Sequence, residues 1–168
     1  MPQGACRGGF RQAALPGPTA FRGIRGDPDR RCRRSDQLSE APLFQRIGGG
    51  DTIDRLVDSF YDRMERLEEA RTIRAMHRED LEPSRSILKR YLTEWLGGLP
   101  AYSSERGHPR MRMRHMHVPI DSAARDAWLL CMRGALDETV SGEAERTAIY
   151  EAMAKLADWM RNTDDSPA

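Results

Sequence analysis

The sequence predicts an all-α domain. Apolar residues recur every three to four positions in four long stretches, which is the period of an amphipathic helix. No stretch shows the sustained alternation of β-branched and aromatic residues that is typical of a strand. Glycine and proline interrupt the four stretches at positions suited to helix ends. Together these observations favour helices packed on helices around one core.

The first long helix is expected to begin at Asp51. Three glycines, Gly48 to Gly50, break the chain just before it, and Asp51 is a suitable N-cap. A short second helical piece is expected over residues 69–77. The apolar stripe of the first helix consists of Ile53, Leu56, Val57, Phe60, Tyr61, Met64 and Leu67.

Three further long helices follow. Pro83 stands in the first turn of the next one, where a missing N–H costs nothing, and two glycines at 97–98 stop it. Residues 99–120 contain three prolines and are expected to form a loop. Asp121 or Ser122 caps another helix, and the last runs over about 143–161. Their apolar faces contain Ile87, Leu88, Tyr91, Leu92, Trp95 and Leu96; Ala124, Ala127, Trp128, Cys131 and Ala135; and Ile149, Met153, Leu156 and Met160.

Composition and charge narrow the classes of function. The 168 residues include 27 Lys+Arg and 26 Asp+Glu, so net charge does not direct the chain toward nucleic acid or a membrane. No apolar run approaches the ~18–20 residues of a membrane span, and the N-terminus lacks the apolar core of a secretory signal. Three widely spaced cysteines imply no disulfide framework. We expect a cytoplasmic globular protein, monomer or homodimer, that has neither nucleic acid nor a membrane as partner.

The first 40 residues differ from the rest. They hold eight Arg, no Lys and four acidic residues, a net charge of +4, whereas the remainder carries −3. They also contain six Gly and four Pro, and such a segment buries too little apolar area to offset its ordering entropy. We therefore predict a disordered Arg/Gly/Pro-rich extension over 1–40, a folded domain over 41–163 and a flexible tail over 164–168.

Three of the four histidines, His108, His115 and His117, lie within ten residues. Besides a solvated loop, two metal sites are candidates. A His-x-His pair with a third histidine suits zinc or copper, although the neighbouring arginines repel a bare dication. A single axial histidine suits haem iron, because haem brings four nitrogen ligands of its own. Arg112 and Arg114 suit haem propionates better than they suit a zinc site.

Five sequence segments stand in a regular order: FQRIGG at 44–49, SFY at 59–61, YLTEWLGG at 91–98, GHPRMRMRH at 107–115 and DAWLLCM at 126–132. In this order, and at these separations, they resemble the truncated haemoglobins of group II. The similarity covers about residues 41–160. The resemblance implies a truncated two-over-two globin sandwich that holds one non-covalent haem b.

The resemblance also implies roles for individual residues. His115 matches the family's proximal ligand, the axial ligand of the haem iron. Arg112 and Arg114 match positions that face the propionates. Tyr61 matches the tyrosine that points its hydroxyl at the iron-bound ligand, and Trp128 matches the tryptophan whose indole N–H reaches the same pocket.

Two further positions match the family and two depart from it. Ser84 and Leu88 match the distal positions of the helix that faces the iron. His77 stands where the family usually has Tyr or Phe; we include it among the residues that line the pocket, with a surface histidine as the alternative. After the proximal ligand this chain reads MHV at 116–118 instead of the usual x-Pro-Phe, so His117 inherits no role.

The resemblance implies binding of dioxygen, and of other diatomic ligands such as nitric oxide or carbon monoxide, at His-ligated iron. Tyr61, Trp128 and His77 would supply up to three hydrogen-bond donors, and each bond to a charged partner contributes about 1.5–3 kcal/mol. Because about 1.4 kcal/mol is tenfold in affinity, release would be slow. Slow release favours nitric-oxide dioxygenase or peroxidase-like chemistry with an unknown reductase over simple oxygen delivery. A histidine at position 77 would also make the pocket sensitive to pH.

Two alternatives stay open. One is a haem-free globin-fold module for partner binding or signalling, although such a descendant has little reason to keep His115, Tyr61 and Trp128 together. The other is a zinc or copper site at His108, His115 and His117.

Overall fold

The computed structural model describes residues 41–165, and within that range it is helical without any strand. The all-α prediction is thereby confirmed. The predicted extension at 1–40 and most of the predicted tail lie outside the described residues. The elements are α2 (Leu43–Arg46), α3 (Gly50–Arg66), the 3-10 helix η1 (Glu68–Ala70), α4 (Arg71–Ala75), α5 (Glu82–Trp95), α6 (Ser103–Arg106), α7 (Met111–His115), α8 (Ser122–Thr139) and α9 (Glu143–Met160).

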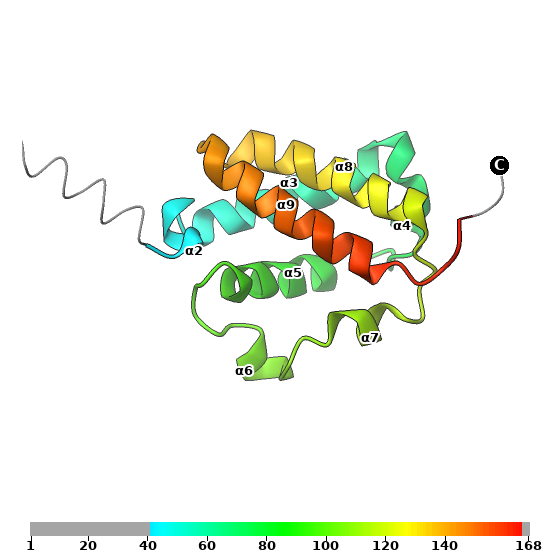
Figure 1. The fold of residues 1–168 in the computed structure, drawn as a ribbon, viewed down its shortest axis with the longest axis horizontal. Helices are drawn as coiled ribbons and strands as arrows, with labels where there is room; N and C mark the ends of the chain where they lie inside the picture. The colour runs from blue at the N-terminus through cyan, green and yellow to red at the C-terminus, as the bar shows by residue number, and fades with distance from the viewer. Residues whose placement is uncertain (1–40, 166–168) are drawn as a thin grey trace, which may run out of the picture.

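The four long helices form two antiparallel pairs. In the first pair, α5 runs against α3: Arg85 reaches Asp62, and Lys89, one turn further on, reaches back to Asp58. In the second pair, a three-residue connection turns α8 back into α9. The pairs are joined because α3 packs along α8, which Figure 1 shows at the top of the molecule.

One core runs through both pairs. The whole apolar stripe of α3 is buried, except for Leu67, which lies just beyond the helix and is partly buried. The fully buried side chains come mainly from α3 and α8, and the partly buried Leu88 and Trp128 pack against this core. The largest are Phe60, Ile53, Leu56, Met64, Leu92, Met132, Leu136 and Ile149.

Two of the predicted features at helix ends are present in the structure, and one is not. The Asp121 side chain accepts a hydrogen bond from the Ala124 N–H at 2.8 Å and so caps α8. Pro83 lies in the first turn of α5. The predicted N-cap at Asp51 is wrong, because α3 begins one residue earlier, at Gly50. Its N-cap is Gly49, whose φ of 71° is a left-handed conformation that favours glycine.

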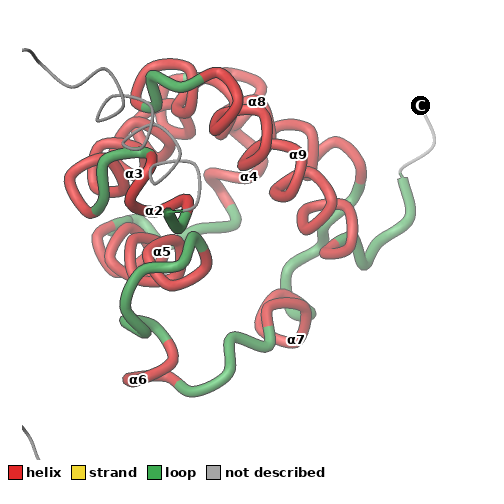
Figure 2. Tube along the Cα trace, turned by 60° about the vertical axis from the view of Figure 1, so that its left-hand side comes forward, coloured by secondary structure: helices red, strands yellow, loops and turns green. Residues whose placement is uncertain are grey.

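The expectation that 99–120 is a loop is wrong in part, because the segment contains α6 and α7. Both are short, and neither has a buried residue, so the periodicity that reveals long helices is missing from their sequence. Figures 1 and 2 show both of them lying outside the bundle of long helices. The segment that carries His108, His115 and His117 therefore consists of short helices joined by loops.

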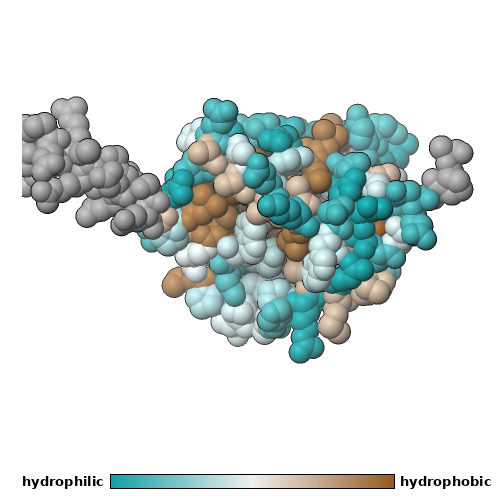
Figure 3. Space-filling view, in the orientation of Figure 1, coloured by the Kyte–Doolittle hydropathy of each residue, from teal (hydrophilic) through white to brown (hydrophobic). Residues whose placement is uncertain are grey.

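The face of the molecule that α9 crosses is mostly hydrophilic. Figure 3 shows hydrophobic side chains on it as separate small areas between charged and polar ones. Among the described helices, none combines the length and the apolar character that crossing a membrane requires.

Candidate functional site

Tyr61 is the centre of the first group of predicted site residues. It lies on α3 and is buried, with 5% of its surface exposed. Burial raises the pKa of Tyr61 to about 12, although a side-chain hydrogen bond with Ser84 of α5 and the nearby charge of Arg85 oppose the rise. The phenol is therefore protonated at physiological pH and can donate a hydrogen bond.

His77 joins the same group from the segment after α4. Its ring lies 5.9 Å from the Tyr61 ring, centroid to centroid, at an angle of 80°. The His77 Nδ1 atom lies 2.8 Å from the carbonyl oxygen of Ile73. Because a carbonyl oxygen only accepts, Nδ1 carries the proton in the neutral ring and Nε2 carries a lone pair. Neutral His77 is thus an acceptor at Nε2, and only the protonated ring donates there.

The predicted distal residues Ser84 and Leu88 lie on α5, four residues apart and half-buried, so they share one face of the helix. Trp128 of α8 is half-buried and reaches Tyr61 only through Phe60. Phe60 packs at 5.2 Å from the Trp128 ring and at 5.0 Å from the Tyr61 ring. Within residues 41–165, the structure records no hydrogen bond from the indole N–H of Trp128, which leaves that donor available.

Arg85 is a member of this group that the sequence did not reveal. Its guanidinium carbon lies 5.4 Å from the centre of the Tyr61 ring. The same guanidinium donates to the Asp58 carbonyl at 3.0 Å and to the Asp62 carboxylate at 2.6 Å, and both acceptors lie on α3. Arg85 therefore ties α5 to α3 directly over Tyr61. Its place next to Ser84 in the chain was the only available signal. We call Tyr61, His77, Ser84 and Arg85 the Tyr61 cluster.

His115 lies at the end of α7 and is half-buried. Its Nδ1 atom lies 2.8 Å from the Met111 carbonyl oxygen, one turn earlier in the helix. As in His77, the carbonyl fixes the proton on Nδ1, so the neutral ring presents the Nε2 lone pair. A metal-binding histidine has this arrangement, with one nitrogen donating to a carbonyl while the other binds the metal.

The two arginines of α7 contact backbone carbonyls. Arg112 donates to the carbonyls of Trp159 and Arg161, the latter at 3.0 Å, where α9 ends. Arg114 donates through Nε to the Pro109 carbonyl at 2.8 Å and so closes the turn before α7. Among the described residues, the structure records no hydrogen bond that joins α7 to the Tyr61 cluster. Contact of Arg112 and Arg114 with propionates stays a prediction.

The three clustered histidines do not form a metal site of their own. His108 and His117 are exposed, and His108 Nδ1 accepts a hydrogen bond from the Arg110 N–H at 3.2 Å. Within residues 41–165, no three His, Cys, Asp or Glu side chains are close enough together to hold a metal ion. The zinc or copper alternative at His108, His115 and His117 therefore has no support in the geometry.

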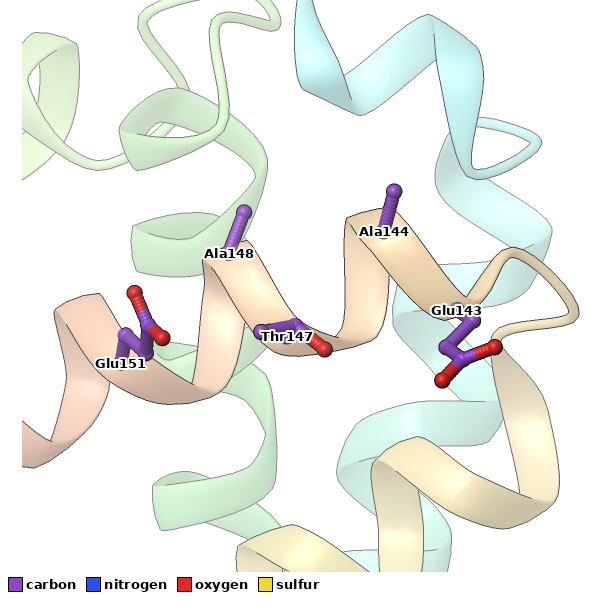
Figure 4. A pocket seen from close by; sticks show the side chains of 5 residues that line it. All are labelled: Glu143, Ala144, Thr147, Ala148 and Glu151. Carbon is purple, nitrogen blue, oxygen red and sulfur yellow. The ribbon is translucent and has the colours of Figure 1, made fainter.

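A shallow depression lies elsewhere, on the outer side of the first half of α9. Figure 4 shows its small side chains, Ala144, Thr147 and Ala148, between the carboxylates of Glu143 and Glu151. It shares no residue with the Tyr61 cluster or with α7. It adds nothing to the candidate site.

Comparison with known proteins identifies the family. A family model described as bacterial-like globin matches residues 42–162. Group 2 truncated hemoglobin YjbI of Bacillus subtilis is 39% identical over 89 residues, which cover 53% of this chain and 65% of that protein. Two-on-two hemoglobin-3 of Arabidopsis thaliana is 30% identical over 103 residues, 61% of this chain and 58% of the relative. The matched region thus spans less than two thirds of these relatives.

Solved structures extend the match to the fold. A group II 2-on-2 hemoglobin from Agrobacterium tumefaciens superposes with a TM-score of 0.72 at 42% identity, over 74% of this chain and 96% of that one. A cold-adapted truncated hemoglobin from Pseudoalteromonas haloplanktis gives a TM-score of 0.72 at 32% identity, over 73% and 99%. The two-over-two globin fold expected from the sequence is confirmed. The chain belongs to the bacterial-like globin family, and within it to the group II truncated haemoglobins.

Proposed function

We propose that this chain binds haem b without a covalent bond, with His115 as the axial ligand of the iron. The observation that carries the proposal is the hydrogen bond from His115 Nδ1 to the Met111 carbonyl at 2.8 Å. It leaves Nε2 unprotonated in the neutral ring, which is the form that binds iron. Membership of the haemoglobin family supports the same assignment.

The residues present fit a haem group. Haem requires one imidazole, apolar side chains and few polar groups besides, because it carries its own nitrogen ligands. The half-buried side chains of Leu88, Ile87 and Met111 pack against the core and supply apolar surface on α5 and α7. Bound ferrous haem would supply an iron that takes up dioxygen, nitric oxide or carbon monoxide.

The Tyr61 cluster would determine how long such a ligand stays. The raised pKa of Tyr61 keeps its hydroxyl a donor, and the indole of Trp128 is a donor at any pH. Each hydrogen bond to a charged partner is worth about 1.5–3 kcal/mol, which is roughly tenfold to a hundredfold in release rate. Neutral His77 presents an acceptor at Nε2, so in that form it donates no hydrogen bond to a negatively charged ligand.

Slow release of a polar ligand suits redox chemistry better than oxygen delivery. We therefore propose the oxidation of nitric oxide or peroxide-linked turnover as the reactions of this protein, with a cytoplasmic reductase as its electron source. Its form would be a monomer or a homodimer.

The proposal is tested by adding hemin to the full chain and recording absorption spectra of the oxidised, dithionite-reduced and carbon-monoxide-bound forms. We expect a Soret band that saturates at one hemin per chain and shifts in each state. His115→Ala should abolish it, whereas the control His117→Ala, two residues away and exposed, should leave it intact. Saturable uptake that is equal in the two variants would refute ligation by His115. No uptake at all would favour a haem-free interaction module.

A further inference from the structure

The helix that carries His115 has little to hold it in place. It has five residues, none of them buried, and it contacts α9 rather than the central α3–α8 packing. A helix of this length is not stable on its own, because so few hydrogen bonds cannot offset the cost of nucleation. The position of His115 must therefore be fixed by contacts from outside α7.

Asn162 provides such contacts through both ends of its side-chain amide. Its Nδ2 group donates to the carbonyl oxygens of His115 and Val118, each at 3.0 Å. Its Oδ1 atom accepts from the Ile120 N–H at 2.9 Å and from the Thr163 hydroxyl at 3.0 Å. One side chain thus binds three backbone groups of the turn that follows His115, although it lies more than forty residues further along the chain.

The backbone around Asn162 adds to this attachment. The N–H groups of Asn162 and Thr163 both donate to the Ile120 carbonyl, at 3.0 and 3.3 Å. Arg112, in the first turn of α7, donates to carbonyls at the end of α9. Both ends of the segment from Arg112 to Ile120 are therefore bound to residues 159–163, which we call the C-terminal clamp.

We propose that Asn162 is a positioning residue for His115. Its amide holds the His115 carbonyl, and with it the orientation of the α7 turn from which the imidazole projects. The consequence for the iron ligand rests on the proposed function, whereas the attachment of the turn does not. The clamp makes the C-terminal end of the domain part of the proximal side of the site.

The test compares three variants of the full chain, each with and without hemin. Asn162→Ala removes all of the amide's hydrogen bonds. Asn162→Asp keeps the acceptor for the Ile120 N–H and loses the donors to His115 and Val118. The control is Asp165→Ala. Asp165 lies two residues beyond the C-terminal clamp and binds Ser122, the first residue of α8, rather than the α7 turn.

Hydrogen exchange of backbone amides measures directly how firmly the turn after α7 is held. In Asn162→Ala we expect the Ile120 and Val118 amides to exchange about 30-fold faster, the equivalent of about 2 kcal/mol at 1.4 kcal/mol per tenfold. In Asn162→Asp, Ile120 should stay protected while Val118 exchanges faster. Asp165→Ala should leave both amides as they are in the parent chain. Equal acceleration in Asn162→Ala and Asp165→Ala, or none in Asn162→Ala, would overturn the inference.

The second measurement examines the bond between His115 and the haem iron. In the reduced, hemin-loaded chain, Asn162→Ala should broaden and shift the iron–histidine stretching band in the resonance Raman spectrum. It should also speed hemin transfer to apomyoglobin about tenfold, whereas Asp165→Ala changes neither. An unchanged band alongside a loosened turn would refute positioning of His115. A chain that takes up no hemin would refute the proposed function, and exchange at Ile120 would still decide whether Asn162 holds the turn.

Discussion

Replacing Tyr61 by Phe should cost stability at neutral pH and add stability in alkali. At pH 7 the variant loses the polar contact of the Tyr61 hydroxyl with the Ser84 side chain, worth about 1 kcal/mol. In the parent chain, burial raises the pKa of Tyr61 from 10.0 to about 12. Above pH 10 the unfolded chain therefore binds fewer protons than the folded chain, and the free energy of unfolding falls as the pH rises.

The size of the effect follows from the two pKa values. A difference of two units corresponds to about 2.7 kcal/mol in total, and about 1.3 kcal/mol of it has been lost by pH 11. Tyr61→Phe has no phenol to ionise, so its free energy of unfolding does not fall by this amount. We expect the two stability profiles to cross near pH 11.

Ser84→Ala is the matched control, because it removes the same polar contact and keeps the phenol. Urea denaturation of the full chain, followed by fluorescence of its three tryptophans at pH 7, 9, 10 and 11, compares the variants. The two should be equally destabilised at pH 7 and diverge above pH 10. Parallel profiles at all four values would show that ionisation of Tyr61 does not limit alkaline stability.

Three further outcomes follow from the same structure. Arg85→Ala should lower the free energy of unfolding by about 2 kcal/mol, and the control Lys89→Ala should lower it by less than about 1 kcal/mol. The reason is that Arg85, unlike Lys89, adds a cation–π contact with Tyr61 to its ion pairs. Equal losses in urea denaturation would refute a special role for Arg85. Replacing glycine by alanine inside a helix usually raises the free energy of unfolding by about 1 kcal/mol, but Gly134→Ala should raise it by less, because the Cβ of the new alanine overlaps the Arg63 guanidinium. In an Arg63→Ala background the same substitution should give the full gain. An equal gain in both backgrounds would count against the overlap. Glu94 accepts backbone hydrogen bonds from Ser103 and Tyr102, which lower its pKa, so the stability it contributes is present above pH 4.5 and disappears as the pH falls further. The protection of the amides of residues 102–103, measured relative to the unfolded chain at the same pH, should fall in acid in the parent chain, and Glu94→Gln should remove this dependence.

The long helices could be predicted from sequence because each buries a continuous apolar stripe. The stripe of α3 is an example, since its spacing identified nearly every residue that the structure buries there. The error at Asp51 arose because the left-handed backbone at Gly49 decides where the chain enters α3. α7 gave no such signal. It buries no residue, and the residue before it, Arg110, has a φ of 44°, a conformation that an arginine adopts only when the surrounding structure imposes it.

The candidate site shows a similar division between local and distant determinants. The likeness to known relatives pointed to His115 and Tyr61, and the hydrogen bonds that set the two histidine rings come from carbonyls four residues earlier, within reach of local sequence. Arg85 and Asn162 act across 23 and 47 residues; apart from the position of Arg85 next to Ser84, nothing near them in the sequence distinguishes them from surface residues. Because α7 cannot hold its own position, the orientation of His115 depends on such a distant residue. Substitutions just beyond the end of α9, at Asn162, should therefore alter the proximal side of the site while leaving the α3–α8 core intact.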